Sequence, residues 1–273
     1  MLDNLIKMCI YKIININLRL SEISNCFDKG WNRFKINNNS KVDIICKPLS
    51  YKKFNHDILY TDQLLCDIEK ILKTDTQIVF ANSDFSKIYL EYEKRDGQGL
   101  VLNYIFYTHA VQRHMLQLHS SLIATPDNHG IMFLGPSGIG KTTQAELWNK
   151  YRDALIINGD IVFVQETPEG FLGWGTPWHG SSPYCENTSV PLKAMVVLKQ
   201  APENSIRELT GFEKVSEVSN SVFYPQWLEN GMELCLETLD HLLTDIPVYL
   251  LSCRPDEDAV RLTEQAIFGG AGQ

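Results

Sequence analysis

The spacing of apolar and polar residues divides the chain into two parts near residues 106–118. In the first part, apolar residues come in short runs that alternate with polar residues, which is the period of a half-buried strand. These runs predict strands at residues 14–18, 42–46 and 77–81. Two further runs, 87–93 and 100–106, lie on either side of a turn sequence at 96–99 and predict a hairpin. Residues 1–106 are therefore expected to form a smaller, mostly β region.

Beyond residue 106 the pattern predicts strands and helices in mixed order. A connecting helix is expected first, because Ala110, Val111, His114 and Leu118 recur at helical spacing. Short apolar runs then predict strands at 118–124, 131–134, 154–160, 161–164, 170–174, 192–198 and 248–252. Apolar residues at helical spacing predict helices at 143–151, 213–245 and 256–267. The sequence therefore predicts a domain of the α/β or α+β class over residues 107–273.

One segment of this second part carries a complete phosphate-binding signature. Residues 135–142 read Gly-Pro-Ser-Gly-Ile-Gly-Lys-Thr, which satisfies the pattern G-x-x-x-x-G-K-[ST]. A predicted strand precedes the segment and a predicted helix follows it, as this type of loop requires. The glycines let backbone amides curl around an anion, and the start of the helix adds a partial positive charge. The segment therefore predicts a site for a nucleoside triphosphate in a P-loop nucleotide-binding domain.

The residues of this segment have distinct expected roles. Lys141 is expected to reach the β- and γ-phosphates of ATP, and Thr142 to bind Mg²⁺ through its hydroxyl. ATP and Mg²⁺ are thus the expected cofactors. Contacts to the nucleotide are expected from Gly135, Pro136, Ser137, Gly138, Ile139, Gly140, Lys141, Thr142 and Thr143.

Asp160 is the second candidate residue. It ends the apolar run 154–160, about twenty residues after Lys141, where phosphate-loop enzymes place the carboxylate that holds Mg²⁺. The alternative is an aspartate that caps a turn at the end of a strand. We expect Asp160 to serve as a metal ligand or to handle the proton of the acceptor.

Three further residues are candidates for catalysis. His119 lies on a strand next to the loop, where it could contact the γ-phosphate or the acceptor, or simply stabilise the strand. His179 lies in the Gly- and Pro-rich segment 175–180, which predicts a shaped loop; its alternative role is packing. Arg254 follows the last predicted strand, where a guanidinium could hold transferred phosphate charge or remain a surface charge.

Composition limits the partners of the chain. The net charge of -8 provides no strong basic field for binding a nucleic-acid backbone. The seven cysteines are scattered, with neither a C-x-x-C pair nor zinc-type spacing, so free thiols in a reducing compartment are expected. No apolar run approaches the ~20 residues needed to span a bilayer. The sequence therefore predicts a cytoplasmic protein that binds neither nucleic acid nor a membrane.

With these residues in this order, residues 115–268 resemble the HPr serine kinase/phosphorylase family, whose core has the phosphoenolpyruvate carboxykinase-like nucleotide fold. The resemblance rests on Leu118-His119-Ser120, a short hairpin, the loop segment 134–142 and the segment 156–162. A hairpin directly before the loop is unusual for doubly wound nucleotide folds, which use parallel crossovers there. The resemblance implies that His119 is an active-site residue, that Asp160 handles metal or proton, and that Arg254 contacts phosphate.

The chain also departs from this family at identifiable positions. The family has two consecutive aspartates after the strand, whereas this chain has Gly159 followed by Asp160, and it lacks the arginine–glycine signature that follows the second acid. Relatives of this kinase group that occur beside ribosomally made, modified peptides resemble peptide-serine kinases. The resemblance therefore implies a small protein or a peptide as the acceptor.

Three functions follow as hypotheses. The leading one is a Mg²⁺-dependent kinase that transfers the γ-phosphate of ATP to a serine or threonine hydroxyl of a small protein or peptide. The alternatives are a non-catalytic, nucleotide-gated binding module, favoured by Gly159 in place of a carboxylate, and a small-molecule kinase. The N-terminal region is expected to recognise the acceptor or to form a homo-oligomer. Its predicted strands 87–93 and 100–106 would offer an edge to an extended peptide.

Overall fold

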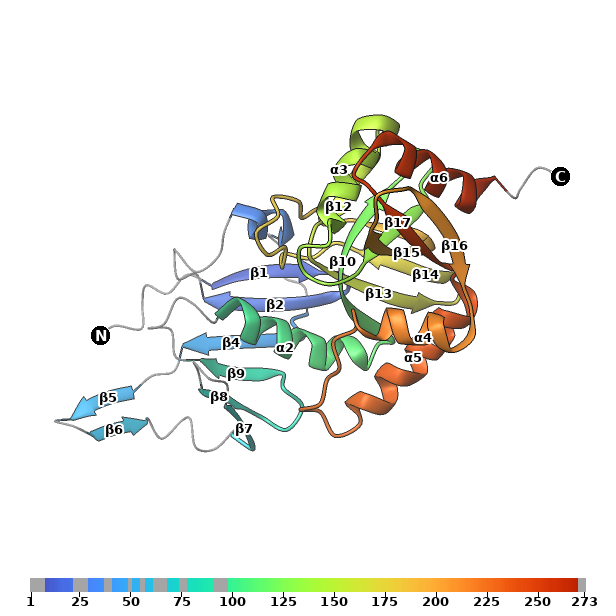
Figure 1. Cartoon of the computed structure of the whole chain (residues 1–273). Helices are drawn as coiled ribbons and strands as arrows, with labels where there is room; N and C mark the ends of the chain where they lie inside the picture. Colours follow the sequence, from blue (N-terminus) through green and yellow to red (C-terminus); the bar gives the residue numbers. More distant parts are fainter. Residues whose placement is uncertain are drawn as a thin grey trace. The chain divides into compact units, whose positions relative to one another are not determined.

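The computed structural model describes residues 8–21, 29–36, 41–48, 51–54, 57–60, 68–73, 78–90 and 98–269. The chain divides into two compact units of mixed α/β structure, Met1–His109 and Ala110–Gln273 (Figure 1). Within the described ranges, no helix combines the length and the apolar character needed to cross a membrane. The cysteines described there are buried and form no disulfide bond: Cys9, Cys46, Cys185, Cys235 and Cys253.

The first unit is built on a seven-stranded sheet of order β3-β1-β2-β4-β9-β8-β7. Its strands are β1 (Met8–Ile13), β2 (Ile16–Ser21), β3 (Lys35–Ile36), β4 (Ile44–Pro48), β7 (Lys70–Lys73), β8 (Ile78–Ala81) and β9 (Lys87–Leu90). The other elements are a hairpin of β5 (Tyr51–Phe54) and β6 (Asp57–Tyr60), the 3-10 helix η1 (Lys29–Phe34) and the helix α2 (Gln98–Val111), which crosses the boundary between the units. The strands predicted at 42–46 and 77–81 are confirmed as β4 and β8.

The strand predicted at 14–18 is confirmed from Ile16 onward, as part of β2, but its start is wrong because two strands meet there. β1 and β2 form an antiparallel hairpin in which Ile13 pairs with Ile16, and the chain reverses at Ile14, where φ is 57°. Within the predicted range, the alternation of apolar and polar residues belongs to β2, where Ile16, Leu18 and Leu20 are buried. The turn between β1 and β2 is two residues long, which equals the two-residue repeat of a strand. The apolar–polar alternation therefore continues across the turn and does not reveal it.

The first strand of the hairpin predicted at 87–106 is confirmed as β9, but the hairpin is wrong, since residues 98–111 form the helix α2. Its side chains are buried on nearly all sides: Val101, Leu102, Ile105, Phe106 and Tyr107 are at most 3% exposed. A helix that is apolar all round has no amphipathic period, and a short apolar run alone cannot distinguish it from a buried strand. The turn at 96–97 and residues 91–93 lie outside the described residues.

Two related expectations are corrected as well. β9 pairs with both β4 and β8, so it is an inner strand and offers no edge to an extended peptide. The connecting helix predicted to extend to Leu118 ends at Val111. His114 has a φ of 52°, and β10 begins at Met115.

The second unit contains an eight-stranded sheet of order β11-β10-β13-β14-β15-β17-β16, with β12 paired to β10 and a further pairing between β11 and β15. Its strands are β10 (Met115–Ala124), β11 (Gly130–Leu134), β12 (Leu155–Asn158), β13 (Ile161–Thr167), β14 (Gly170–Trp174), β15 (Ser189–Gln200), β16 (Ser205–Leu209) and β17 (Val248–Cys253). Because β11 also pairs with β15, strands β10, β13, β14, β15 and β11 close into a ring. β10 and β11 form the antiparallel hairpin that the sequence predicts directly before the loop.

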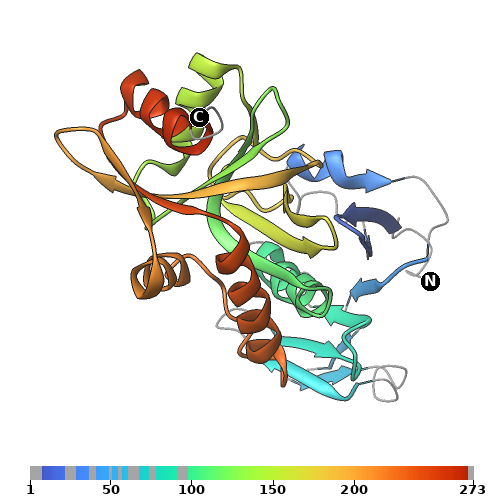
Figure 2. The ribbon, with the colours of Figure 1, turned by 90° about the vertical axis from the view of Figure 1, so that its right-hand side faces the viewer.

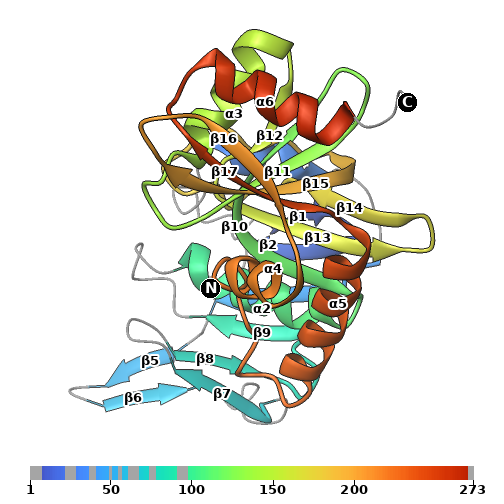
Figure 3. The same ribbon diagram turned by 45° about the vertical axis from the view of Figure 1, so that its right-hand side comes forward.

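The helices of the second unit are α3 (Lys141–Arg152), α4 (Gly211–Ser219), α5 (Gly231–Asp245) and α6 (Glu257–Phe268). The predicted helical region 213–245 therefore contains two helices. The apolar pattern of the sequence does not predict β16. α3 and α6 lie side by side on the sheet (Figure 2), whereas α5 packs against β10 (Figure 3). Phe133, Trp148, Val196 and Val260 are at most 1% exposed in the core between α3, α6 and the sheet. Each such side chain stabilises the fold by about 1.5–3 kcal/mol, so this packing holds α3, and the loop that precedes it, in place.

Candidate functional site

The site begins at the loop between β11 and α3. Glycines permit its path, because φ is 136° at Gly135, 79° at Gly138 and 114° at Gly140, values that other residues rarely adopt. The loop turns back on itself, with the amide of Ile139 donating to the carbonyl of Pro136 over 3.3 Å. α3 then begins without a hydrogen bond from a capping side chain. The strand, loop and helix predicted from the sequence are all present, and the helix start presents backbone amides with no side-chain cap.

Lys141, the first residue of α3, folds its side chain back over this loop. Its Nζ donates to the carbonyl oxygens of Gly135 at 3.0 Å and Pro136 at 3.2 Å. Burial lowers the pKa of the Lys141 ammonium, and the nearby carboxylate of Asp160 partly opposes that shift. Burial disfavours the charged form of Lys141, and Asp160 offsets only part of this cost. A further anion such as a phosphate beside the ammonium would therefore stabilise the charged form strongly.

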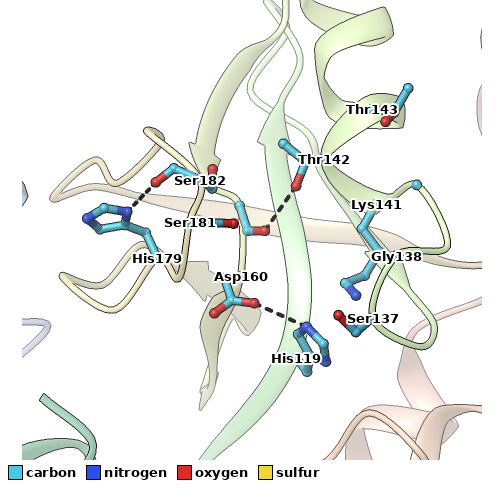
Figure 4. Close-up of a pocket in the computed structure, with 12 residues that line it drawn as sticks. His119, Ser137, Gly138, Lys141, Thr142, Thr143, Asp160, His179, Ser181 and Ser182 are labelled. Atoms are coloured by element: carbon cyan, nitrogen blue, oxygen red, sulfur yellow. Dashed lines mark hydrogen bonds and ion pairs between the residues drawn. The ribbon is translucent and has the colours of Figure 1, made fainter. Parts of the chain in front are cut away.

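His119 and Asp160 lie close together, near the start of the loop. His119 precedes Ser120, which pairs with Leu134, the last residue before the loop. Asp160 occupies the turn between β12 and β13, and its carbonyl accepts a hydrogen bond of 2.8 Å from the amide of Ser120. The two side chains meet with 3.1 Å between His119 Nε2 and Asp160 Oδ1, and both are about one-third exposed, at 29% and 31% (Figure 4). The sheet pairing therefore joins two residues that are distant in the sequence.

The loop and the His119–Asp160 pair line one cavity with a volume of about 250 Å³ (Figure 4). Its lining residues are His119, Ser137, Gly138, Gly140, Lys141, Thr142, Thr143, Gly159, Asp160, His179, Ser181 and Ser182. The predicted contacts Gly135, Pro136 and Ile139 are not among them. The carbonyls of Gly135 and Pro136 accept from Lys141, and Ile139 packs against the hydrophobic core.

His179 lines the cavity on the loop between β14 and β15. Its Nδ1 contacts the carbonyl oxygen of Ser182 (Figure 4). A carbonyl oxygen can only accept, so Nδ1 carries the proton in this contact. This bond closes the short turn that brings Ser181 and Ser182 to the cavity, which gives His179 a role in shaping the loop.

The structure does not bring Arg254 to the cavity. It follows β17 with a side chain that is 56% exposed, and its Nε lies 3.2 Å from Asp256 Oδ2. Its amide donates to Asn204 Oδ1 at 2.8 Å. Asp256 in turn caps α6 by accepting from the amide of Ala259. In this geometry Arg254 contributes to the start of α6 and lies apart from the residues that line the cavity.

Thr142 and Asp160 have the chemistry expected of Mg²⁺ ligands. The Thr142 hydroxyl donates to the carbonyl of Gly159 at 3.3 Å and thus lies beside the turn that carries Asp160. Within the described ranges, no cluster of three or more histidine, cysteine, aspartate or glutamate residues could hold a metal ion. One hydroxyl and one carboxylate fit a Mg²⁺ ion that takes its other ligands from phosphate and water. A metal cage made by protein groups alone does not fit this site.

Gly159 has no room for a side chain. A β-carbon at this position would lie 2.5 Å from Ser182 Cβ and would also overlap Ser182 Oγ. The loop that carries Ser182 therefore occupies the space that a carboxylate at position 159 would need. The cavity has one carboxylate, that of Asp160, among its lining residues.

We expect Gly159→Ala to destabilise the second unit by about 1–3 kcal/mol, since Ser182 must move to admit the new methyl group. The measurement is the free energy of unfolding in urea for wild type, both single variants and the double variant Gly159→Ala/Ser182→Gly. Removing the Ser182 side chain should recover most of the loss caused by alanine. Equal losses in the single and double variants would contradict the steric explanation.

Sequence reasoning missed three lining residues, Gly159, Ser181 and Ser182. The sequence distinguishes Gly159 only as a departure from the carboxylate pair of the family it resembles. The two serines follow His179 and Gly180 in a segment expected to be a shaped loop, which was the available signal. Where that loop folds depends on contacts with β12 and α3. The amide of Glu186 donates to the carbonyl of Ile157 in β12 at 2.7 Å, and the hydroxyl of Tyr184 donates to Glu146 Oε1 in α3 at 3.2 Å.

The fold and the site define a mixed α/β protein in which a glycine-rich loop and a histidine–aspartate pair share one cavity. No protein-family model and no curated protein matches the chain. Among solved structures, the chain is similar to one described as the HPr(Ser) kinase/phosphatase from Coxiella burnetii, with 9% identity and a TM-score of 0.36. The match covers 57% of this chain and 99% of that one. A TM-score this low assigns neither a family nor an activity to the chain.

Proposed function

We propose that the chain is a kinase that transfers the γ-phosphate of ATP to a serine or threonine hydroxyl of a small protein or peptide. The observation that carries the proposal is the single cavity lined by Lys141, Thr142 and the His119–Asp160 pair. Phosphoryl transfer needs neutralisation of phosphate charge and a group that orients the acceptor hydroxyl. This cavity provides residues for both tasks.

Lys141 and the loop would bind the triphosphate. The ammonium exchanges its bonds to the carbonyls of Gly135 and Pro136 for bonds to phosphate oxygens. Backbone amides at the start of α3 add donors that are fixed before the nucleotide arrives, so binding requires little rearrangement. Thr142 and Asp160 would hold Mg²⁺, which neutralises negative charge on the β- and γ-phosphates.

The His119–Asp160 pair would receive the proton of the attacking hydroxyl. Asp160 Oδ1 is engaged with His119 Nε2 at 3.1 Å, which fixes the orientation of the carboxylate. The bond between the hydroxyl oxygen and the γ-phosphorus forms as the bond to the β–γ bridging oxygen breaks, and ADP leaves. With one carboxylate available for both metal and proton, His119 is the nearest group able to share the proton.

One observation favours a second candidate, the nucleotide-gated binding module. Ser182 fills the space next to Gly159, so a second carboxylate cannot be accommodated in this arrangement. A site that binds ATP through the loop but transfers nothing would order the surface around the cavity for a partner. The two candidates differ in whether ATP is consumed.

The test is incubation of the full chain with Mg²⁺, γ-³²P-ATP and a degenerate peptide library with serine or threonine fixed at its centre. A library with alanine at that position is the matched control. We expect label in the serine and threonine libraries only, and none when EDTA removes Mg²⁺. Tight binding of ATP by calorimetry, with no labelled peptide and no ADP formed, would overturn the kinase proposal and favour the binding module.

A further inference from the structure

We infer that Asn158 and Thr176 are positioning residues that fix Asp160 relative to the loop of residues 179–182; this inference deepens the proposed kinase function and rests on it. Both side chains are fully buried, at 0% exposure. Neither lines the cavity. They act on the residues that do line it through hydrogen bonds to two backbone segments.

Asn158 ends β12 and bonds to both segments at once. Its Oδ1 accepts from the amides of Asp160 at 2.8 Å and Ile161 at 3.1 Å, which shapes the turn that carries Asp160. Its Nδ2 donates to the carbonyls of Thr176 at 2.9 Å and Trp178 at 3.4 Å, directly before His179. Both ends of one buried amide are therefore engaged, one with each segment.

Thr176 forms the reciprocal connection. Its hydroxyl donates to the carbonyl of Ile161 at 2.7 Å and accepts from the amide of Trp178 at 3.3 Å. The hydroxyl has a single proton, so the shorter bond to Ile161 rather than the 3.2 Å contact with the carbonyl of Trp178 is its main donation. Thr176 thus joins the strand after Asp160 to the segment before His179.

The two segments touch each other at the cavity as well. Gly180 lies so close to Asp160 that a β-carbon on it would be 2.6 Å from Asp160 Oδ2. The position of Gly180, which follows residues 176–178, therefore bears directly on the position of the proposed reactive carboxylate. Misplacement of reacting groups by about 1 Å can lower a rate by about 100-fold, so the two buried residues should control the rate without touching the reactants.

The hydrogen bonds of Asn158 and Thr176 can be removed by single substitutions that keep the size of the side chain. Removing the Thr176 hydroxyl leaves the carbonyl of Ile161 and the amide of Trp178 without that partner in a dry environment. Thr176→Val keeps the shape and removes the hydrogen bonds, whereas Thr176→Ser keeps the hydroxyl. Thr238→Val is the matched control, because Thr238 is equally buried and its hydroxyl bonds at 3.0 Å to the carbonyl of Leu234 within α5.

The experiment measures initial rates of label transfer from γ-³²P-ATP to the serine-centred library over a range of ATP concentrations. For Thr176→Val we expect the rate at saturating ATP to fall about 10- to 100-fold. The KM for Mg²⁺·ATP should rise as well, because Asp160 is also an expected ligand of Mg²⁺. Thr176→Ser and Thr238→Val should both stay within about threefold in both parameters. Hydrogen exchange should be faster in Thr176→Val at the amides of Asp160, Ile161 and Trp178, and unchanged in α3.

Asn158→Asp provides a second test if Thr176→Val does not fold at the assay temperature. Aspartate keeps the acceptor for Asp160 and Ile161, but it loses the donor to Thr176 and Trp178 and places a buried carboxylate oxygen against their carbonyls. At least the same loss of rate is therefore expected. A folded Thr176→Val or Asn158→Asp that transfers phosphate as fast as Thr238→Val would overturn the inference and leave the kinase proposal intact. Absence of transfer by the wild-type chain would instead refute the proposed function, and the inference with it.

Discussion

Lys141→Ala is expected to lower phosphoryl transfer by at least about 100- to 1,000-fold, because a fixed positive donor at the transferring phosphate is lost. The thermal stability of Lys141→Ala should not fall along with its activity. Burial lowers the pKa of the Lys141 ammonium, and the nearby Asp160 carboxylate only partly opposes this, so the folded state disfavours the charge when no phosphate is bound. Removing the charge therefore removes an unfavourable term in the folded protein. The measurements are the transfer rate with the serine-centred library and the thermal unfolding midpoint.

Lys150→Ala is the matched control for this variant. Lys150 lies on the same helix, but it is exposed and its Nζ contacts the hydroxyl of Tyr151 at 3.1 Å. Its loss should leave transfer and ATP binding unchanged. If Lys141→Ala transferred phosphate at the wild-type rate, the loop would not bind the reacting nucleotide and the kinase proposal would fail.

The second large effect is expected for Asp160→Asn. Asparagine keeps the size of the side chain and an oxygen for the 3.1 Å contact with His119 Nε2, but it removes the negative charge. Since the single carboxylate of the cavity is expected to serve both Mg²⁺ and the acceptor proton, the rate should fall about 100- to 1,000-fold. Binding of Mg²⁺·ATP should also weaken, whereas binding of ATP in EDTA should not.

Transfer by Asp127→Asn, on the exposed turn between β10 and β11, should match wild type and serves as the control. His119→Gln distinguishes the role in proton transfer, which His119 shares with Asp160, from the role in binding Mg²⁺, which it does not share. It should reduce the rate less than Asp160→Asn and leave Mg²⁺·ATP binding unchanged, because His119 is not an expected metal ligand. Wild-type activity in Asp160→Asn would remove Asp160 from the site.

Several elements were predictable because their causes are local. The run Gly130–Leu134 is apolar throughout, and the glycines after it permit the positive φ values of the loop. Trp148 and Ala145 recur at helical spacing and face the core, so α3 follows from its own sequence. Asp160 stands at the end of an apolar run, which marks the end of a strand. Each of these assignments needs only a few neighbouring residues.

The errors arose where burial, rather than local period, decides the structure. Residues 98–111 are apolar on almost every face, so their sequence has no helical period to detect, and packing within the fold selects the helix. The position of Arg254 after a strand leaves a phosphate contact and a surface charge both open, and the resemblance favours phosphate, but its partners are Asp256 and Asn204 at the start of α6. The position of Arg254 in the sequence does not indicate which groups its side chain and amide contact in the folded protein.

By itself, the sequence determined the strand–loop–helix unit around Lys141, the hairpin before it and the carboxylate at the end of β12, since propensity and backbone freedom act over a few residues. Only the tertiary structure decided that His119 meets Asp160 and that Ser182 fills the space beside Gly159. It also decided that Asn158 and Thr176 join the two segments behind the cavity. Those contacts join residues distant in the chain, and they form because the strand pairings of the sheet place their segments together and burial requires their polar groups to be satisfied.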